Sequence, residues 1–286
     1  MALTKEAAAR DITLPSGLHL RYYEAGERGA TPVVLLHGSG PGATGWSNFS
    51  GNIGVIAEAG FHVLAPDMPG WGDSDAVATK DMDHDKTLVE FLDAADTPKA
   101  SLVGNSMGGH TAVRFATLHP DRITHLVTMG ASLGRGPATL FGPGDGPSEG
   151  LKVLVKAYKD PTPENMKALV EIMTYDKKRF ATPELTKARS EAALAHPDHL
   201  RNYVEGLSFG APIPITVDRD KVPGIQAPTL LIHGKDDRVL HYEVTLWLLA
   251  SIPNSRAVLL NRCGHWAMIE HAEEFNRLVV DFLRHN

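Results

Sequence analysis

Residues 100–120 read ASLVGNSMGGHTAVRFATLHP, in which an apolar run passes through a glycine-rich turn into a helical pattern. The run ASLV is short and continuous, which is typical of a strand buried on both faces of a parallel sheet. Gly104-Asn105-Ser106-Met107-Gly108 follows directly. Alone, G-x-S-x-G is a weak pattern, but between a strand and a helix it predicts a nucleophile elbow that lifts the Ser106 hydroxyl above the sheet edge. The alternative is a glycine-rich turn that needs no serine chemistry.

The strand pattern recurs along the chain, alternating with helical patterns. Continuous apolar runs occur at 31–38, 61–70, 123–131 and 228–237, with a weaker one at 256–260. Apolar residues spaced i, i+3, i+4 predict helices over 107–120, 241–252 and 271–285. Residues 11–23 alternate around Pro15-Ser16-Gly17 and predict a hairpin. Strands that alternate with helices predict an α/β class with a mostly parallel sheet flanked by helices.

The stretch 135–215 interrupts this alternation. A Gly/Pro-rich opening precedes four helical segments, at 150–159, 162–173, 182–195 and 197–207. Roughly 80 residues are too many for an ordinary connection, although a long crossover of the core is the alternative. We therefore expect a helical cap inserted between core strands, with the core divided into 1–134 and 216–286.

Composition excludes several function classes. The chain has 286 residues, 43% of them hydrophobic, with 28 Lys+Arg against 34 Asp+Glu and a net charge of −6. This balance gives no reason to expect nucleic acid or an anionic membrane as a partner. One cysteine excludes an internal disulfide and a Cys-rich metal site. No apolar stretch is long enough to span a bilayer, and MALTKEAAAR lacks the apolar segment of a signal peptide, so we expect a cytoplasmic protein.

No metal site is expected. Asp81, Asp83, His84 and Asp85 lie close together, but in a polar run that favours a solvated loop or a helix start. Cys263 is expected to be a packing residue, because Ser106 is the better-supported nucleophile.

Partners for Ser106 follow in the chain order serine, acid, histidine that α/β hydrolases use. The strand at 228–237 ends with Asp236 and Asp237, and the spacing from Gly234 favours Asp237. The turn Cys-Gly-His-Trp supplies His265. A neutral His265 can take the serine proton while Asp237 fixes its tautomer. With 14 histidines in the chain, a loop histidine without a catalytic role is the alternative for His265.

The glycine-rich run His37-Gly-Ser-Gly-Pro-Gly42 follows another strand. Hydrolases of this fold take one oxyanion donor from such a loop and one from the residue after the nucleophile. We assign these donors to the backbone N–H groups of Ser39 and Met107. His37 is expected to be structural, and residues 67–74 (DMPGWGDS) to shape a loop.

Five motifs together resemble one family: HGSGPGATGWSNF (37–49), PGWGDSDAV (69–77), LVGNSMGGH (102–110), HGKDDRV (233–239) and RCGHWAMIEHAEEFNRLVVDFL (262–283). They resemble the meta-cleavage product hydrolases, α/β-hydrolase enzymes of bacterial aromatic degradation, from about residue 18 to the C-terminus. The branch acting on 2-hydroxy-6-oxonona-2,4-dienedioate looks most similar. The resemblance implies hydrolysis of a C–C bond in a 2-hydroxy-6-oxo-hexa-2,4-dienoate, without a cofactor, in a homo-oligomer.

The resemblance also implies substrate-binding residues. Arg189 in the cap would clamp the dienoate carboxylate, for which a guanidinium is suited; a solvated helix face is the alternative. Asn48 and Asn105 would add hydrogen bonds, although for Asn105 a side chain that stabilises the turn is the alternative. Trp266 would pack on the dienoate. His110 reaches a far subsite or is a plain helix residue. Residues that either line the subsite for the C6 substituent or pack the core are Leu140, Phe141, Ile172 and Met173.

Two other functions fit the same triad. A carboxylesterase would not need the clamp of Asn48, Asn105, Arg189 and Trp266. A non-catalytic ligand-binding protein of this fold would not need the intact triad. Dehalogenase and epoxide hydrolase chemistry is disfavoured, since both use an aspartate where this chain has Ser106.

Overall fold

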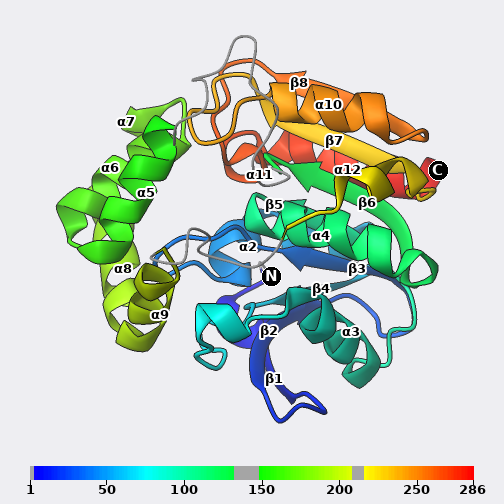
Figure 1. Cartoon of the computed structure of the whole chain (residues 1–286), viewed down its shortest axis with the longest axis horizontal. Helices are drawn as coiled ribbons and strands as arrows, with labels where there is room; N and C mark the ends of the chain where they lie inside the picture. Colours follow the sequence, from blue (N-terminus) through cyan, green and yellow to red (C-terminus); the bar gives the residue numbers. More distant parts are fainter. Residues whose placement is uncertain (1–2, 132–147, 208–215) are drawn as a thin grey trace.

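The computed structural model describes residues 3–131, 148–207 and 216–286. These contain an eight-stranded sheet in the order β1-β2-β4-β3-β5-β6-β7-β8, which confirms the predicted α/β hydrolase fold (Figure 1). Strand β2 pairs antiparallel with β1 and β4, and all other pairs are parallel. The strands are β1 Ala9–Thr13, β2 His19–Ala25, β3 Thr31–Leu36, β4 Phe61–Pro66, β5 Ala100–Asn105, β6 Ile123–Met129, β7 Thr229–Gly234 and β8 Ser255–Leu260.

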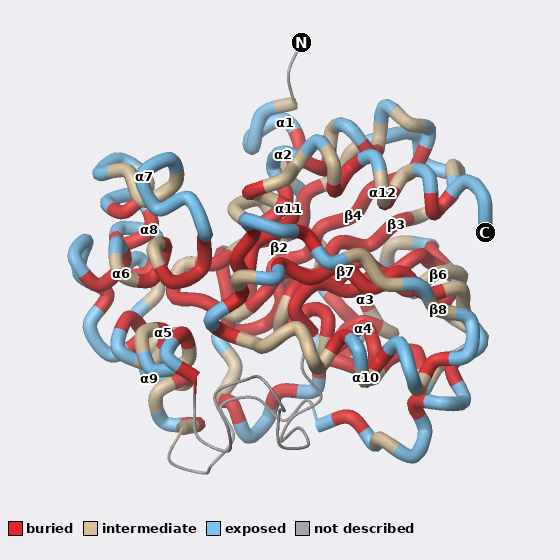
Figure 2. Tube along the Cα trace, turned by 90° about the horizontal axis from the view of Figure 1, so that it is seen from above, coloured by how far each residue is buried: buried red, intermediate tan, exposed pale blue. Residues whose placement is uncertain are grey.

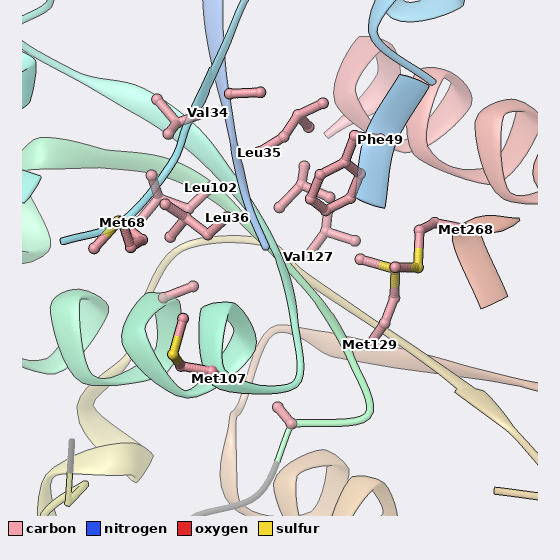
Figure 3. Packing of buried hydrophobic residues seen from close by; sticks show 14 of the residues in the cluster. Val34, Leu35, Leu36, Phe49, Met68, Leu102, Met107, Val127, Met129 and Met268 are labelled. Atoms are coloured by element: carbon pink, nitrogen blue, oxygen red, sulfur yellow. The ribbon is translucent and has the colours of Figure 1, made fainter. Parts of the chain in front are cut away.

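The continuous apolar runs form the buried centre of the sheet, as expected. Every residue of β4, β5 and β7 is buried, because helices cover both faces of a parallel sheet. The hairpin at 11–23 is confirmed as β1 and β2, and the weak run at 256–260 is the parallel edge strand β8. Figure 3 shows side chains of β3, β5 and β6 packed with Phe49 and Met268 from the covering helices.

Helices form a layer on each face of the sheet, as Figure 2 shows. One layer holds α2 Gly45–Glu58, α11 Ala267–Glu270 and α12 Ala272–His285. The other layer holds α3 His84–Ala94, α4 Met107–Leu118 and α10 Glu243–Ser251. Short segments complete the core: α1 Lys5–Ala8, η1 Thr79–Asp81, η2 Pro120–Arg122 and η3 Arg219–Gly224. No helix of the described residues is long and apolar enough to cross a membrane.

Among the described residues between β6 and β7, five α-helices stand beside the sheet rather than on it (Figure 1). They are α5 Glu149–Lys159, α6 Pro163–Met173, α7 Lys177–Phe180, α8 Pro183–Leu194 and α9 Pro197–Leu207. Thr162 and Thr182 cap the first turns of α6 and α8, each followed by Pro, which explains where these helices begin. We call α5–α9 the cap. The predicted domain boundaries at 134/135 and 215/216 involve residues outside the described ranges and stay predictions.

The acidic run before α3 is a helix start. Asp83 is the N-cap and accepts a hydrogen bond from the Lys86 N–H. His84 and Asp85 are buried rather than solvated, because Thr111 bonds the imidazole of His84 and Arg114 pairs with Asp85. Of the two alternatives for this run, the helix start is therefore confirmed and the solvated loop is not. Among the described residues no group of His, Cys, Asp or Glu is arranged to hold a metal ion.

Candidate active site

Ser106 sits in a strained turn between β5 and α4. Its backbone has φ 51° and ψ −114°, a conformation that costs energy in a non-glycine residue and is typical of functional sites. Glycine is required on both sides: a Cβ on Gly104 would lie 2.3 Å from the Gly108 carbonyl oxygen, and one on Gly108 would lie 2.0 Å from the Leu36 oxygen. The strand, turn and helix predicted around Ser106 are therefore present, and Ser106 stays half-buried at the N-terminus of α4.

His265 and Asp237 form a buried hydrogen-bonded pair. The Nδ1–H of His265 donates to Asp237 Oδ2 over 2.7 Å, and both side chains are almost fully buried. The carboxylate that contacts His265 belongs to Asp237 and not to Asp236, as the spacing from Gly234 favoured. Because Nδ1 holds the proton, Nε2 of a neutral His265 is left to accept one.

The turn with His265 adjoins the Ser106 elbow. The Asn105 amide donates to the His265 carbonyl oxygen at 3.3 Å, and the Ser106 N–H donates to the Met129 oxygen at 2.8 Å. A Cβ on Gly130, the residue after Met129, would lie 2.9 Å from the His265 ring. Within the described residues no hydrogen bond joins the Ser106 hydroxyl to His265; this contact is often long before substrate binds.

Asp237 accepts more hydrogen bonds than the sequence predicted. Its Oδ1 accepts from the N–H groups of Val239 at 2.7 Å and Leu240 at 3.0 Å. Its Oδ2 accepts from His265 and also contacts Nε2 of His233 at 3.0 Å. Burial alone would raise the pKa of Asp237, but His265 and His233 hold the pKa well below its usual value. Asp237 is therefore held as an anion, which the role predicted for it requires.

His37 holds the glycine-rich loop 37–42 in place; we call this loop, which is expected to supply an oxyanion donor, the oxyanion loop. The Met68 N–H donates to His37 Nε2 at 2.9 Å, so Nδ1 carries the proton and donates to the Gly38 oxygen at 2.8 Å. The peptide group is planar and trans, so holding the Gly38 C=O toward His37 directs the Ser39 N–H away from it. Burial lowers the pKa of His37 to about 4, so the ring is neutral. These bonds agree with a structural His37. Met107, the other expected donor, is the first residue of α4, where backbone N–H groups lack helical partners.

Asn48 and Asn105 direct their hydrogen bonds at the backbone. Asn48 Oδ1 accepts from the Gly38 N–H at 3.2 Å, and its amide donates to the Thr44 oxygen. Asn105 is fully buried, and its amide faces the Met129 and His265 oxygens. Both residues hold the loops around Ser106 in place. Direct hydrogen bonds from them to a substrate stay a prediction.

Arg189 of α8 is buried beside the turn 263–266, which carries His265 and Trp266, rather than on a solvated helix face. It is only 7% exposed, and its guanidinium lies 4.5 Å from the ring centre of Trp266. Burial lowers the pKa of Arg189 to about 10, so it is charged at neutral pH. None of the described carboxylates pairs with Arg189, and its Nε has no partner there. Because a buried charge is costly without a partner, this arrangement suits an anionic ligand.

The other expected residues lie near this centre. His110, one turn along α4, has its pKa lowered to about 4 by burial and contacts the Ser106 backbone. Ile172 and Met173 are buried at the end of α6, and the Met173 oxygen accepts from the His265 N–H at 2.8 Å. Cys263 is fully buried, and burial raises the pKa of its thiol, which fits a packing role. Leu140 and Phe141 lie outside the described residues.

Polar contacts join the cap to the catalytic loops, and the sequence did not predict them. Glu270 accepts from the Gly264 N–H of the catalytic turn and from the Tyr175 N–H of the cap, both at 2.7 Å. Trp71 Nε1–H donates to the Tyr158 hydroxyl at 3.0 Å. Tyr158 of α5 stacks on Tyr203 of α9, with 3.5 Å between the two ring centres.

The oxyanion loop also packs against the cap backbone. A Cβ on Gly42 would lie 2.9 Å from the Ala193 nitrogen and 3.0 Å from the Arg189 oxygen. Helix α8 therefore cannot move toward the loop without displacing it, and the position of Arg189 is coupled to that of the oxyanion loop.

The chain matches the model of the alpha/beta hydrolase fold over residues 31–272. Two curated relatives are named 2-hydroxy-6-oxononadienedioate/2-hydroxy-6-oxononatrienedioate hydrolase. The one from Cupriavidus pinatubonensis is 42% identical, covering 99% of this chain and 97% of its own. The one from Burkholderia vietnamiensis is 44% identical, covering 98% and 97%.

Solved structures agree. A mutant of a meta-cleavage product hydrolase from Pseudomonas fluorescens IP01 is similar with a TM-score of 0.84 at 30% identity, covering 96% of this chain and 97% of that one. The 2-hydroxy-6-oxo-6-phenylhexa-2,4-dienoate hydrolase of Rhodococcus sp. strain RHA1 gives a TM-score of 0.81 at 25% identity, covering 96% and 99%.

Proposed function

The chain belongs to the α/β hydrolase family and, within it, to the meta-cleavage product hydrolases, and we propose that Ser106, His265 and Asp237 perform its cleavage of a carbon–carbon bond. The observation that supports these roles most directly is the buried 2.7 Å bond from His265 Nδ1 to Asp237 Oδ2, on a turn that adjoins the Ser106 elbow.

A C–C bond breaks only where the departing carbon has an electron sink. In a 2-hydroxy-6-oxo-2,4-dienoate the proton of the C2 hydroxyl first moves to C5, which converts the dienol to a 2,6-dioxo form. His265 Nε2 is the group available to carry that proton. When the C5–C6 bond then breaks, its electron pair is delocalised into the 2-oxo group.

The same residues serve the hydrolytic step. His265 takes the proton from Ser106 Oγ, or from a water, as that oxygen attacks C6, and Asp237 stabilises the imidazolium. The Ser39 and Met107 N–H groups hold the oxyanion. In sum one water is consumed: its hydroxyl ends on C6 as a carboxylic acid, and its proton ends on the C2 oxygen. That proton restores the hydroxyl lost in ketonisation and gives 2-hydroxypenta-2,4-dienoate.

Arg189 supplies the recognition of the C1 carboxylate in this proposal. Its buried guanidinium lies on Trp266 without a carboxylate partner among the described residues. This suits a planar carboxylate, which a neutral ester would not supply. This observation favours the dienoate hydrolase over a carboxylesterase. The curated relatives are named for 2-hydroxy-6-oxononadienedioate, and we propose the same substrate class here, an acid whose C6 substituent ends in a second carboxylate.

The test is a substrate panel. Dienoates with methyl, phenyl and carboxyethyl groups on C6 are compared with a p-nitrophenyl ester, following the visible dienolate band. We expect the carboxyethyl dienoate to have the highest kcat/KM and Ser106→Ala to abolish its loss. Ser251→Ala, a control at the last residue of α10, should keep it. Ester turnover without dienoate loss, or dienoate loss that persists in Ser106→Ala, would contradict the proposal. Tight dienoate binding without turnover would indicate a non-catalytic binder.

On the family resemblance we also propose a cytoplasmic homo-oligomer. Light scattering of the purified chain measures its mass in solution, and a monomer at micromolar concentration would contradict the second part of this proposal.

A further inference from the structure

The Asp237 carboxylate faces two imidazoles. His265 Nδ1 lies 2.7 Å and His233 Nε2 lies 3.0 Å from the same oxygen, Oδ2. His233 comes from β7, four residues before Asp237, and both side chains are completely buried. The function proposed above uses only His265, so His233 is a buried titratable group that the mechanism leaves unexplained.

The surroundings of His233 determine its tautomer. Nε2 faces Asp237 Oδ2 and, at 2.9 Å, the Leu240 carbonyl oxygen. A carbonyl oxygen can only accept, so Nε2 must carry a proton. Nδ1 lies 2.7 Å from the Thr245 hydroxyl of α10, which can donate to it. The Thr245 hydroxyl and the Leu240 carbonyl group thus hold the ring so that its Nε2–H is shared between the Leu240 oxygen and Asp237 Oδ2.

We propose that His233 is a positioning residue of the triad: its fixed Nε2–H, held by Thr245 and Leu240, locks the plane of the Asp237 carboxylate and sets how strongly Asp237 holds the proton on His265. This inference rests on the proposed roles of Ser106, His265 and Asp237. It assigns His233 no contact with substrate.

Two physical effects follow from the shared oxygen. Rotation of the carboxylate would break bonds on both of its oxygens, because Oδ1 is held by Val239 and Leu240; Oδ2 therefore stays directed at His265. The Nε2–H of His233 also withdraws negative charge from Oδ2, which lowers the pKa of Asp237 and weakens its attraction for an imidazolium. Without His233, the proton on His265 would be held more tightly, and His265 would be a slower acid in later steps.

In the part of the chain that the structure describes, few other ionisable groups surround Asp237. His233 faces it from β7 and His265 from the catalytic turn. Cys263, also on that turn, interacts with Asp237 and with the neighbouring Asp236 and Glu270. A change in the kcat–pH profile on replacing His233 therefore reports on the ionisation of these neighbouring side chains. Of them, His233 and His265 are the two that bond to Asp237 Oδ2.

The experiment compares two near-isosteric replacements. His233→Met removes the donor, whereas His233→Gln retains an N–H near the position of Nε2. We expect His233→Met to lower kcat on the order of tenfold, to leave KM for the dienoate within about twofold, and to move the acid limb of the kcat–pH profile upward by roughly half a pH unit or more. His233→Gln should restore kcat to within about threefold of the wild type and return the acid limb. His62→Gln is the control, a strand histidine bonded to Glu24 far from the triad, and should keep both kcat and the profile.

Several outcomes would overturn the inference. A folded His233→Met variant with the wild-type kcat and pH profile would do so. An equal loss of kcat in His233→Met and His233→Gln with an unchanged pH profile would also do so, because it indicates a packing role alone. If neither variant folds, nitrogen-15 NMR of the wild-type imidazole decides: a protonated Nε2 with a bare Nδ1 is expected, and the opposite tautomer refutes it. Activity that survives in His265→Ala would instead refute the triad itself, so the two failures are distinguishable.

Discussion

Replacing Arg189 by methionine should weaken substrate binding and stabilise the protein at the same time. The guanidinium is buried on Trp266, and in the described part of the chain its Nε has no partner and no carboxylate neutralises it. A buried arginine that served stability would be expected to have a carboxylate partner. An arginine that binds an anionic ligand is expected to lack one in the free protein, because the ligand supplies the missing partner.

The magnitudes follow from the contacts. Truncating one member of a buried, hydrogen-bonded charge pair costs about 2–5 kcal/mol of binding, which corresponds to a rise in KM of roughly 30-fold or more. In the free protein, the substitution relieves an unsatisfied buried donor worth about 1–3 kcal/mol and removes a cation–π contact worth about 0.5–2 kcal/mol. We therefore expect a net gain on the order of 1 kcal/mol, or a rise in Tm of about 2–4 °C.

The assay measures kcat and KM for a dienoate acid and for its C1 methyl ester, beside thermal unfolding without substrate. Arg189→Met should lose the preference for the acid while kcat changes less than KM. Arg201→Met, which removes an exposed arginine paired with Asp198 on α9, is the matched control and should change neither. A variant that keeps the acid preference, or one that unfolds several degrees earlier than the wild type, would refute the reasoning.

Three further predictions concern the loops around the site. Gly42→Ala should raise the dienoate KM several-fold by displacing α8, whereas Gly29→Ala, also at positive φ but with open space around it, should cost only about 1 kcal/mol of stability; equal KM values in both would contradict this. Glu270→Gln turns an amide NH₂ toward the N–H of Gly264 or Tyr175, so one of these donors loses its acceptor. We expect a loss of about 1–3 kcal/mol in unfolding free energy and a lower kcat, whereas the control Glu273→Gln, at an exposed position, should change neither. Because the folded pKa of Asp237 is lowered, its stabilising contribution is complete above the unfolded value of about 4 and is lost as the pH falls below it. The urea-measured stability gap between wild type and Asp237→Asn should therefore shrink from pH 7 to pH 3; a constant gap would count against a charged Asp237.

Local signals were enough to predict the core. Strands β4, β5 and β7 are buried along their whole length, so each appears in the sequence as an unbroken apolar run. Ser106 was predictable because an elbow needs glycine at both Gly104 and Gly108. Asp237 was favoured over Asp236 by a spacing of three residues from Gly234, a distance within one turn.

The remaining features depend on contacts between distant segments. Asn48 belongs to α2, and only the fold places its oxygen on the Gly38 N–H. Glu270 lies 95 residues from Tyr175, its partner in the cap, and its sequence position shows only a helix near the C-terminus. His233 precedes Asp237 by four residues, but its tautomer is set by Thr245 on another element. Arg189 could be assigned only by resemblance, because nothing in TKARSEA shows that this helix face is buried.

The bond from the His265 N–H to the Met173 oxygen has a consequence for engineering. Protein engineers exchange specificity modules by cutting where the chain enters and leaves them, here between β6 and β7. In this enzyme the cap also contacts the turn that carries His265, both through the Met173 oxygen and through Glu270. A chimera joined only at the two chain crossings would pair a foreign cap with the native His265 turn, and on the roles proposed above we expect it to lose activity as well as selectivity. A successful graft transplants the 262–271 turn together with the cap.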